Sequence, residues 1–202
     1  MLLVSIDPSI QSTGVSIYDT ETKKTMVAIY TKKLPAKKKT GVIIRTDDID
    51  VFFVPHDKGV EYRNNLERYD DVCSHIYSIV EQLIEGRFEV PCEMSLMMEG
   101  ASFGSKGKLY DIGRFCGILE SKFLAGMNIV AIDVPPSEWK KAMGLGGNAK
   151  KEVIYKSQVN GDLASILAEL VAKGMGWKKG SPVEDLCDAY LIGKHHLNVI
   201  SA

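Results

Sequence analysis

The chain of 202 residues lacks several features that define whole classes of protein. No stretch approaches the roughly 18 consecutive apolar residues of a membrane-spanning helix, so we expect no membrane partner. The four cysteines lie far apart and form no C-x-x-C pair, which predicts reduced, mostly buried thiols and no cysteine nucleophile. The first segment reaches Asp7 without a basic region, so we expect no signal peptide. Together these absences favour a folded protein of the cytoplasm, in a bacterium or a virus-infected host cell.

The net charge of −1 conceals a strong segregation of charge along the chain. Residues 22–46 contain eight basic side chains and no acidic one, whereas residues 47–99 contain thirteen acidic and four basic ones. A face of one sign attracts polyanions such as nucleic acid even when the total charge is near zero. A solvated surface without a partner is the alternative explanation, and composition alone does not decide between the two.

Hydrophobic spacing predicts a β-meander followed by alternating helices and strands. Apolar runs and alternation predict strands at residues 2–7, 15–18, 25–31, 41–54, 94–99 and 128–134. Spacings of three and four predict helices at residues 60–86, 109–125, 136–143, 149–158, 161–174 and 183–196. This order favours a mixed sheet with helices on both faces. We therefore expect a single α/β domain over residues 1–202, with a lysine-rich β excursion at about residues 20–60.

Four acidic residues occupy positions in these elements where an acid is costly. Asp7 closes the first strand, Glu99 closes the strand at 94–99, and Asp185 and Asp188 share one face of an otherwise apolar helix. Buried acids are unfavourable unless they are paired or bind a cation. If the four meet at one edge of the sheet, two hard divalent cations are their natural partners. Such a pair of ions stabilises both the attacking and the leaving oxygen of a phosphodiester displacement.

Each acid taken alone also has a purely structural explanation. Asp7 precedes Pro-Ser and is typical of a turn, Glu99 can pair with a lysine, and Asp185 suits the N-terminus of a helix. Glu184 neighbours Asp185 but lies about 100° around the helix, so it is the second choice as a ligand.

With these residues assembled, the sequence resembles the RuvC family of Holliday-junction resolvases. Four segments carry the resemblance: SIDPSIQSTGVSIYD at 5–19, LMMEG at 96–100, VPPSEWKKAMGLGGNAKKEVI at 134–154 and EDLCDAYLIG at 184–193. The third segment is the most specific, because sugar kinases and actin-like ATPases share openings like the first. The resemblance implies an RNase H-like fold with a central mixed five-stranded sheet, to which the residues at 20–60 add an extended β-hairpin insertion.

The resemblance also implies an activity and a set of site residues. A crossover junction endodeoxyribonuclease nicks four-way DNA junctions symmetrically and leaves 5′-phosphate and 3′-hydroxyl ends. Asp7, Glu99, Asp185 and Asp188 are then the catalytic residues and the ligands of two Mg²⁺ ions, for which Mn²⁺ can substitute. The backbone amides of residues 144–148 are expected to cradle a phosphate. The expected DNA contacts are Lys140, Lys150, Lys151, Phe103, Lys37, Lys38 and Lys39.

The implied partners are branched DNA and a second copy of the chain, as a homodimer. The helix at 109–125 is a candidate for the dimer face, with packing in the core as its alternative. Two other functions remain open at this stage: an RNase H-like nuclease for flaps, forks or RNA-containing hybrids, and a catalytically silent junction-binding module. An ATPase is not expected, because 202 residues leave no room for the second subdomain of a nucleotide cleft, and so we expect no nucleotide cofactor.

Overall fold

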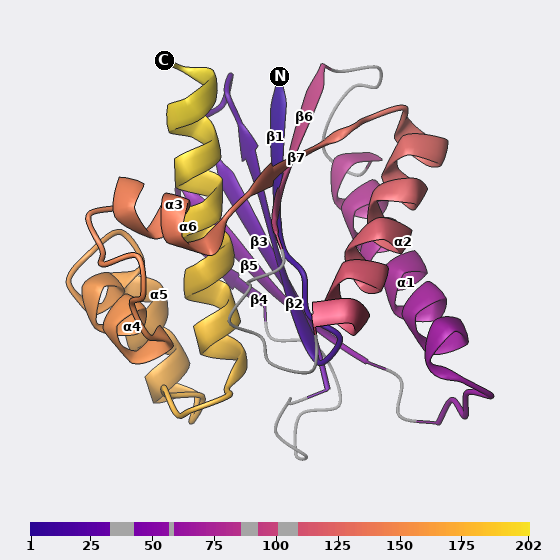
Figure 1. Cartoon of the computed structure of the whole chain (residues 1–202). Coiled ribbons are helices and arrows are strands. Elements are labelled where there is room, and N and C mark those ends of the chain that lie inside the picture. The colour runs from indigo at the N-terminus through magenta and orange to yellow at the C-terminus, as the bar shows by residue number, and fades with distance from the viewer. Residues whose placement is uncertain (33–42, 57–58, 86–92, 101–108) are drawn as a thin grey trace.

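The fold is built on one seven-stranded sheet. It is seen in a computed structural model that describes residues 1–32, 43–56, 59–85, 93–100 and 109–202. The strand order is β4-β5-β3-β2-β1-β6-β7 (Figure 1). The strands are β1 (Leu2–Asp7), β2 (Ser12–Asp19), β3 (Thr25–Thr31), β4 (Ile43–Arg45), β5 (Ile49–Pro55), β6 (Met94–Glu99) and β7 (Ala131–Val134).

Helices cover both faces of this sheet (Figure 1). One face packs against α1 (Asn65–Glu85) and α2 (Leu109–Met127). On the other face α6 (Pro182–Ile200) runs along the strands, with α3 (Pro136–Ala142), α4 (Lys151–Val159) and α5 (Ala164–Ala172) beside it. The predicted α/β class, with a mixed sheet between two helical layers, is confirmed. No helix in the described part of the chain is long and apolar enough to cross a bilayer.

The sheet has two strands more than the central five that the resemblance implied. They are β4 and β5, a hairpin within the insertion expected at about 20–60, formed where the pattern at 41–54 predicted one strand. Thr46 turns the chain, because its side-chain oxygen accepts the Ile49 amide at 2.9 Å and its own amide donates to the Ile49 carbonyl. The hairpin then pairs β5 with β3 in parallel, which satisfies the backbone of an otherwise open edge. Buried Val51 and Phe53 hold it there, because they extend the core.

Alternation along the central strands separates two cores. Leu2, Val4 and Ile6 of β1 face α1 and α2, where an apolar cluster forms with residues such as Phe115. The intervening residues face α6, and in β1, β2 and β6 most of them are small or polar. Because strand residues two apart share a face, Asp7 must lie under α6. The same rule places Glu99 of β6 on the α6 face.

The remaining elements lie close to their predicted places. The predicted strand at 128–134 shortens to β7, because Asn128 takes a left-handed conformation (φ 55°) after α2 and the Ile129 amide donates to the Phe123 carbonyl at 3.4 Å. The helix predicted at 109–125 packs in the core through Phe115, Leu119 and Phe123. Buried thiols were expected, and Cys73 and Cys187 are buried and free.

Candidate active site

Two strand ends bring the first two predicted acids together. β1 and β6 are parallel, and Ile6 of β1 pairs with Met98 of β6. The next position in this register places Asp7 beside Glu99, where both strands end. Side chains at the carboxyl ends of neighbouring parallel strands project from the same edge of the sheet. The prediction that Asp7 and Glu99 share an edge therefore follows from the observed pairing.

A glycine allows α6 to lie directly on this edge. Gly14 of β2 pairs with Asp7 across the antiparallel ladder. A Cβ atom at Gly14 would lie 2.7 Å from the Ala189 Cβ and 2.7 Å from the Asp185 carbonyl oxygen, closer than real Cβ contacts occur. The absence of a side chain at this one position therefore brings the Asp185 backbone down onto the strand beside Asp7. Gly14 positions α6, although the sequence marks it only as one glycine in a turn-like segment.

Lys151 links the acids of α6. Its ammonium nitrogen lies 2.9 Å from Asp185 Oδ1 and 2.9 Å from Asp188 Oδ2. The two carboxylates are almost fully buried, whereas the lysine side chain is 43% exposed. Lys151 is the first residue of α4, so this pair of contacts fixes the start of α4 against the first half of α6. The sequence predicted Lys151 only as a DNA contact, because it stands beside Lys150.

The acids and Lys151 form one electrostatic cluster. Burial raises the pKa of Asp7 well above its ordinary value, and the negative charge of Glu99 raises it further. Burial and the charge of Asp188 raise the pKa of Glu99 to about 7. Burial also raises the pKa of Asp188, although Lys151 opposes this effect. Burial alone would lower the pKa of Lys151, but the charges of Asp188, Asp7 and Asp185 raise it above its ordinary value.

These shifts describe a site with too little positive charge for its carboxylates. The pKa values of Asp7, Glu99 and Asp188 are all raised although Lys151 lies among them, so an additional cation would be stabilised there. The donors are carboxylate oxygens, which Mg²⁺ and Mn²⁺ prefer. Asp188 Oδ1 is buried and has no hydrogen-bond partner among the described residues, so it is available as a ligand. The residues therefore fit a divalent cation in their chemistry.

The described side chains do not form a ready-made metal cluster. In the ranges that the structure describes, no three His, Cys, Asp or Glu side chains are grouped closely enough to hold a metal ion. The Lys151 ammonium lies between Asp185 and Asp188, where it supplies the positive charge itself. The predicted pair of Mg²⁺ ions thus stays a prediction, which requires the Lys151 side chain to move.

Of the predicted DNA contacts, Lys151 and Lys140 lie near the four acids. The charge of Lys140 on α3 lowers the pKa values of Glu99 and Asp188, which places it near both acids. Lys150 precedes α4 and is exposed. The predicted contacts Phe103, Lys37, Lys38 and Lys39 lie outside the described residues.

Part of the predicted phosphate cradle at 144–148 forms hydrogen bonds within the protein. The Gly144 amide donates to the Lys141 carbonyl at 3.0 Å, and the Leu145 amide donates to the Lys140 carbonyl at 2.8 Å. These bonds end α3, and Gly144 adopts the positive φ of 74° that this ending needs. Two of the five amides are therefore used within the protein, and Gly146, Gly147 and Asn148 remain the candidates for a phosphate.

Two further polar residues of α6 are Glu184 and His196. Glu184, the second-choice ligand, turns away from the cluster and accepts a 2.8 Å hydrogen bond from the Gly180 amide. His196, for which the sequence predicted no role, is fully buried between α6 and the sheet, with Nδ1 2.9 Å from Ser5 Oγ and Nε2 2.9 Å from Ser95 Oγ. It holds the second half of α6 against β1 and β6. A serine within each of two apolar strands, Ser5 and Ser95, is the sequence feature that could have revealed it.

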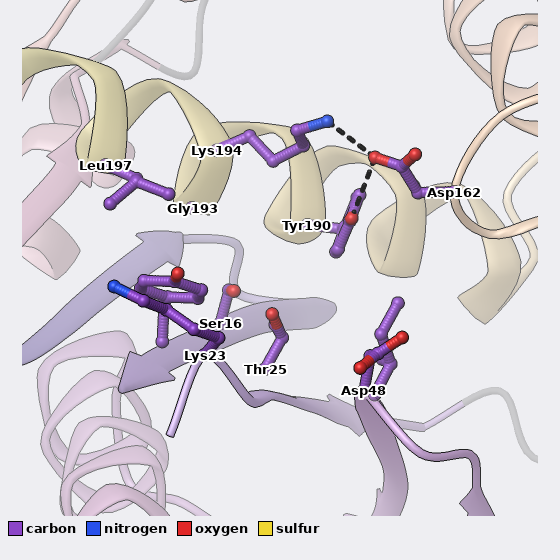
Figure 2. Close-up of a pocket in the computed structure, with 11 residues that line it drawn as sticks. Ser16, Lys23, Thr25, Asp48, Asp162, Tyr190, Gly193, Lys194 and Leu197 are labelled. Atoms are coloured by element: carbon purple, nitrogen blue, oxygen red, sulfur yellow. Dashed lines mark hydrogen bonds and ion pairs between the residues drawn. The ribbon is translucent and has the colours of Figure 1, made fainter. Parts of the chain in front are cut away.

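A pocket of about 320 Å³ lies between α6 and the strands β2 and β3 (Figure 2). At one side of it the Tyr190 hydroxyl and the Lys194 ammonium both bind the Asp162 carboxylate, at 3.0 and 2.5 Å. These contacts attach the segment between α4 and α5 to α6. None of the predicted site residues lines this pocket, so it is separate from the carboxylate cluster.

Comparison with known proteins yields matches in structure but not in sequence. No protein-family model matches the chain, and no curated protein matches its sequence. The structure of Thermus thermophilus RuvC aligns over 100% of this chain and 97% of that chain, with a TM-score of 0.51 and 15% identity. The chain has a RuvC-like fold. A structure of T. thermophilus RuvC in complex with a Holliday junction substrate also aligns, over 99% of this chain and 96% of that chain, at 13% identity and a TM-score of 0.49.

The RuvC-like fold agrees with the fold that the four sequence segments implied. At 15% identity the likeness establishes the arrangement of helices and strands. The assignment of the site residues rests on the strand register, the contact at Gly14 and the ion pairs of Lys151.

Proposed function

We propose that this protein is a metal-dependent endonuclease that cuts branched DNA, chiefly four-way junctions, in recombination and repair. One observation carries the proposal: within a RuvC-like fold, β1, β6 and α6 bring four acids into a single buried cluster. A structural role does not explain such a cluster, since each added carboxylate destabilises the others. The resemblance of the four sequence segments supports the same function. The products would be paired nicks with 5′-phosphate and 3′-hydroxyl ends.

In this proposal Asp7, Glu99, Asp185 and Asp188 hold two Mg²⁺ ions. Bound Mg²⁺ supplies a deprotonated water as nucleophile and stabilises the charge on the departing oxygen. Asp188 Oδ1, which is buried and without a hydrogen-bond partner among the described residues, would be one ligand of a cation. Glu99, the last residue of β6, would orient the attacking water. Lys151 contacts Asp185 and Asp188, and it would have to give up these contacts to a bound cation.

The basic residues around the cluster would bind the DNA backbone. Lys140, whose charge acts on Glu99 and Asp188, and Lys150, the neighbour of Lys151, would contact phosphates near the cleaved bond. Phosphate contacts carry little sequence information, so the shape of the junction determines the choice of substrate. Two symmetric nicks need two active sites, so we propose a homodimer. Size-exclusion chromatography with light scattering tests this assembly directly.

A nicking assay tests the activity. The wild-type protein is mixed with a labelled four-way junction, linear duplex, a flap and an RNA–DNA hybrid, each with Mg²⁺, Mn²⁺ or EDTA. We expect paired cuts in the junction that need the metal. Asp7→Asn should abolish cutting but not binding, since it removes one negative charge and no basic residue. Asp70→Asn is the matched control, because Asp70 is exposed on α1 and pairs with Lys122.

The outcomes of this assay distinguish the junction nuclease from its alternatives. Preferential cutting of the flap or the hybrid would support a metal-dependent nuclease with a substrate other than the four-way junction. Cutting that persists in Asp7→Asn would contradict the proposed site. Junction binding without cutting under any metal condition would refute the nuclease.

A catalytically silent junction-binding module is the second candidate, and the position of Lys151 favours it. A lysine that permanently neutralises Asp185 and Asp188 would leave no need for a metal ion. Calorimetric titration with Mn²⁺ distinguishes the two candidates. Binding that is abolished by Asp188→Asn supports the nuclease, whereas a lack of Mn²⁺ binding in the wild type, together with tight junction binding, supports the module.

A further inference from the structure

A second pocket, of about 460 Å³, adjoins the carboxylate cluster. Lys151 belongs to both, since it lines the pocket while its ammonium group contacts Asp185 and Asp188. Glu184, the neighbour of Asp185 in the chain, forms another part of the wall. The volume falls in the range of about 300–1,000 Å³ that is typical of ligand pockets. A nucleic-acid strand lying across the four acids would therefore pass the mouth of this pocket.

An aromatic side chain forms one wall of this pocket. Trp177, from the segment between α5 and α6, stacks on Tyr155 of α4, with ring centroids 5.8 Å apart and an angle of 26° between the rings. Tyr155 packs against the core and does not line the pocket, so it supports the indole from behind. A tryptophan held in place by a second ring is a prepared stacking surface, because little freedom is lost when a ligand binds.

The charges around the pocket favour a neutral ring inside and phosphates at its rim. Lys150 and Lys179 line the pocket, and neither forms an ion pair with any other described residue. Two carboxylates also line it: Glu184, which accepts the Gly180 amide, and Glu152, which pairs with Lys156 at 2.7 Å. An anion buried deep in the pocket would meet these carboxylates. A nucleobase carries no charge, while the phosphates on either side of it suit the two lysines.

We propose that this pocket binds one unpaired nucleobase of the cleaved strand, stacked on Trp177, with the adjacent phosphates on Lys150 and Lys179. The inference rests on the proposed nuclease function and deepens it. Stacking accepts any base, because every base has a π face. The pocket therefore selects for an unpaired nucleotide rather than for a sequence. Extruding a base from continuous duplex is costly, whereas a base at a branch point, where stacking is interrupted, is easier to extrude, so branched DNA is preferred.

A double-mutant cycle, in which substitutions in the protein are combined with an abasic site in the DNA, tests the pocket. A single abasic site is moved, one nucleotide at a time, along the cut strand of a four-way junction. For the wild type, kcat/KM should fall about tenfold or more at one position, where the missing base is the one that stacks. Trp177→Ala should show the same loss on normal DNA and no further loss at that position. Trp177→Phe, which retains a ring, should recover most of the activity, and Lys122→Ala, on the opposite helical layer, is the matched control.

The non-additivity at one position distinguishes stacking from a structural defect. A Trp177→Ala variant that is merely misfolded would lose activity equally on every junction, with or without the abasic site. If the two losses multiply at all positions, or if Trp177→Ala cuts like the wild type, the pocket is refuted while the nuclease stands. If the wild type binds the junction but does not cut it, the same proteins and junctions are compared by their binding affinities instead of kcat/KM. The same pattern of losses then supports or refutes the pocket. If it neither binds nor cuts, the proposed function and the pocket are both refuted.

Discussion

His196 makes the fold sensitive to mild acid. Its ring is fully buried beneath α6, between Ser5 of β1 and Ser95 of β6. Burial lowers the pKa of His196 to about 4, and the neighbouring His195 contributes in the same direction, although a backbone hydrogen bond with Val4 opposes them. The perturbation is a change of pH from about 7.5 to about 5, at which an exposed histidine becomes protonated.

The size of the effect follows from the two states of the ring. The unfolded chain binds the proton below its ordinary pKa of 6.5, whereas the folded protein binds it only below about 4. The contribution to stability is therefore complete above pH 6.5 and is lost as the pH falls toward 4. Each pH unit between the two pKa values is worth about 1.4 kcal/mol. At pH 5 the folded state should have lost about 2 kcal/mol, and below pH 4 about 3 kcal/mol.

Urea unfolding, followed by circular dichroism at several pH values, measures this loss. Carboxylates with raised pKa values change the stability in the opposite direction, so the comparison is made between variants. His196→Gln retains a polar side chain that does not titrate, and its free energy of unfolding should change by about 2 kcal/mol less than that of the wild type between pH 7.5 and pH 5. His75→Gln, at a half-exposed histidine on α1, is the matched control and should follow the wild type. Equal losses in wild type and His196→Gln would refute the reasoning.

Three further predictions concern packing, thiol chemistry and binding. Gly14→Ala should lower the free energy of unfolding by roughly 1–3 kcal/mol in urea, because its Cβ would meet α6, whereas Gly117→Ala, which meets open space, should not destabilise. Equal effects of the two changes would contradict the close contact. Burial raises the pKa values of Cys73 and Cys187, so peptide mapping after treatment with a thiol reagent at pH 8 should find both unlabelled until urea unfolds the chain. Lys150→Ala should reduce the slope of the logarithm of the junction-binding constant against the logarithm of the salt concentration by about one, the value of a single phosphate contact. An unchanged slope would exclude Lys150 from the interface.

Several elements of the fold could be predicted from local sequence. The apolar runs that became β1 and β6, and the spacing of three and four that became α1, α2 and α6, depend on which residues turn away from water. The division of the predicted 41–54 strand into β4 and β5 was harder to predict, because the turn uses the Thr46 side chain in place of a glycine or proline signal. The pairing of β5 with β3 joins residues far apart along the sequence, and short-range patterns do not specify such partners.

The candidate site likewise contains residues that local sequence identifies and residues that it does not. Asp7 and Glu99 were recognisable because each ends an apolar strand, and Asp185 and Asp188 because they interrupt an apolar helix. The role of Lys151 was not recognisable, because an ion pair with residues 34 and 37 positions away has no local signature. Gly14 was equally hidden, since a glycine needed for close packing has the same appearance in a sequence as one needed for a turn.

The sequence by itself determined the positions and types of most elements and the identity of the acids, because burial periodicity and the cost of a buried charge act locally along the chain. The tertiary structure alone decided which elements meet. It placed Gly14 under α6, brought the Lys151 ammonium between Asp185 and Asp188, and joined Ser5 and Ser95 through His196. Each of these contacts connects residues distant in sequence, so its energy depends on the packing of the whole sheet against its helices rather than on any local pattern.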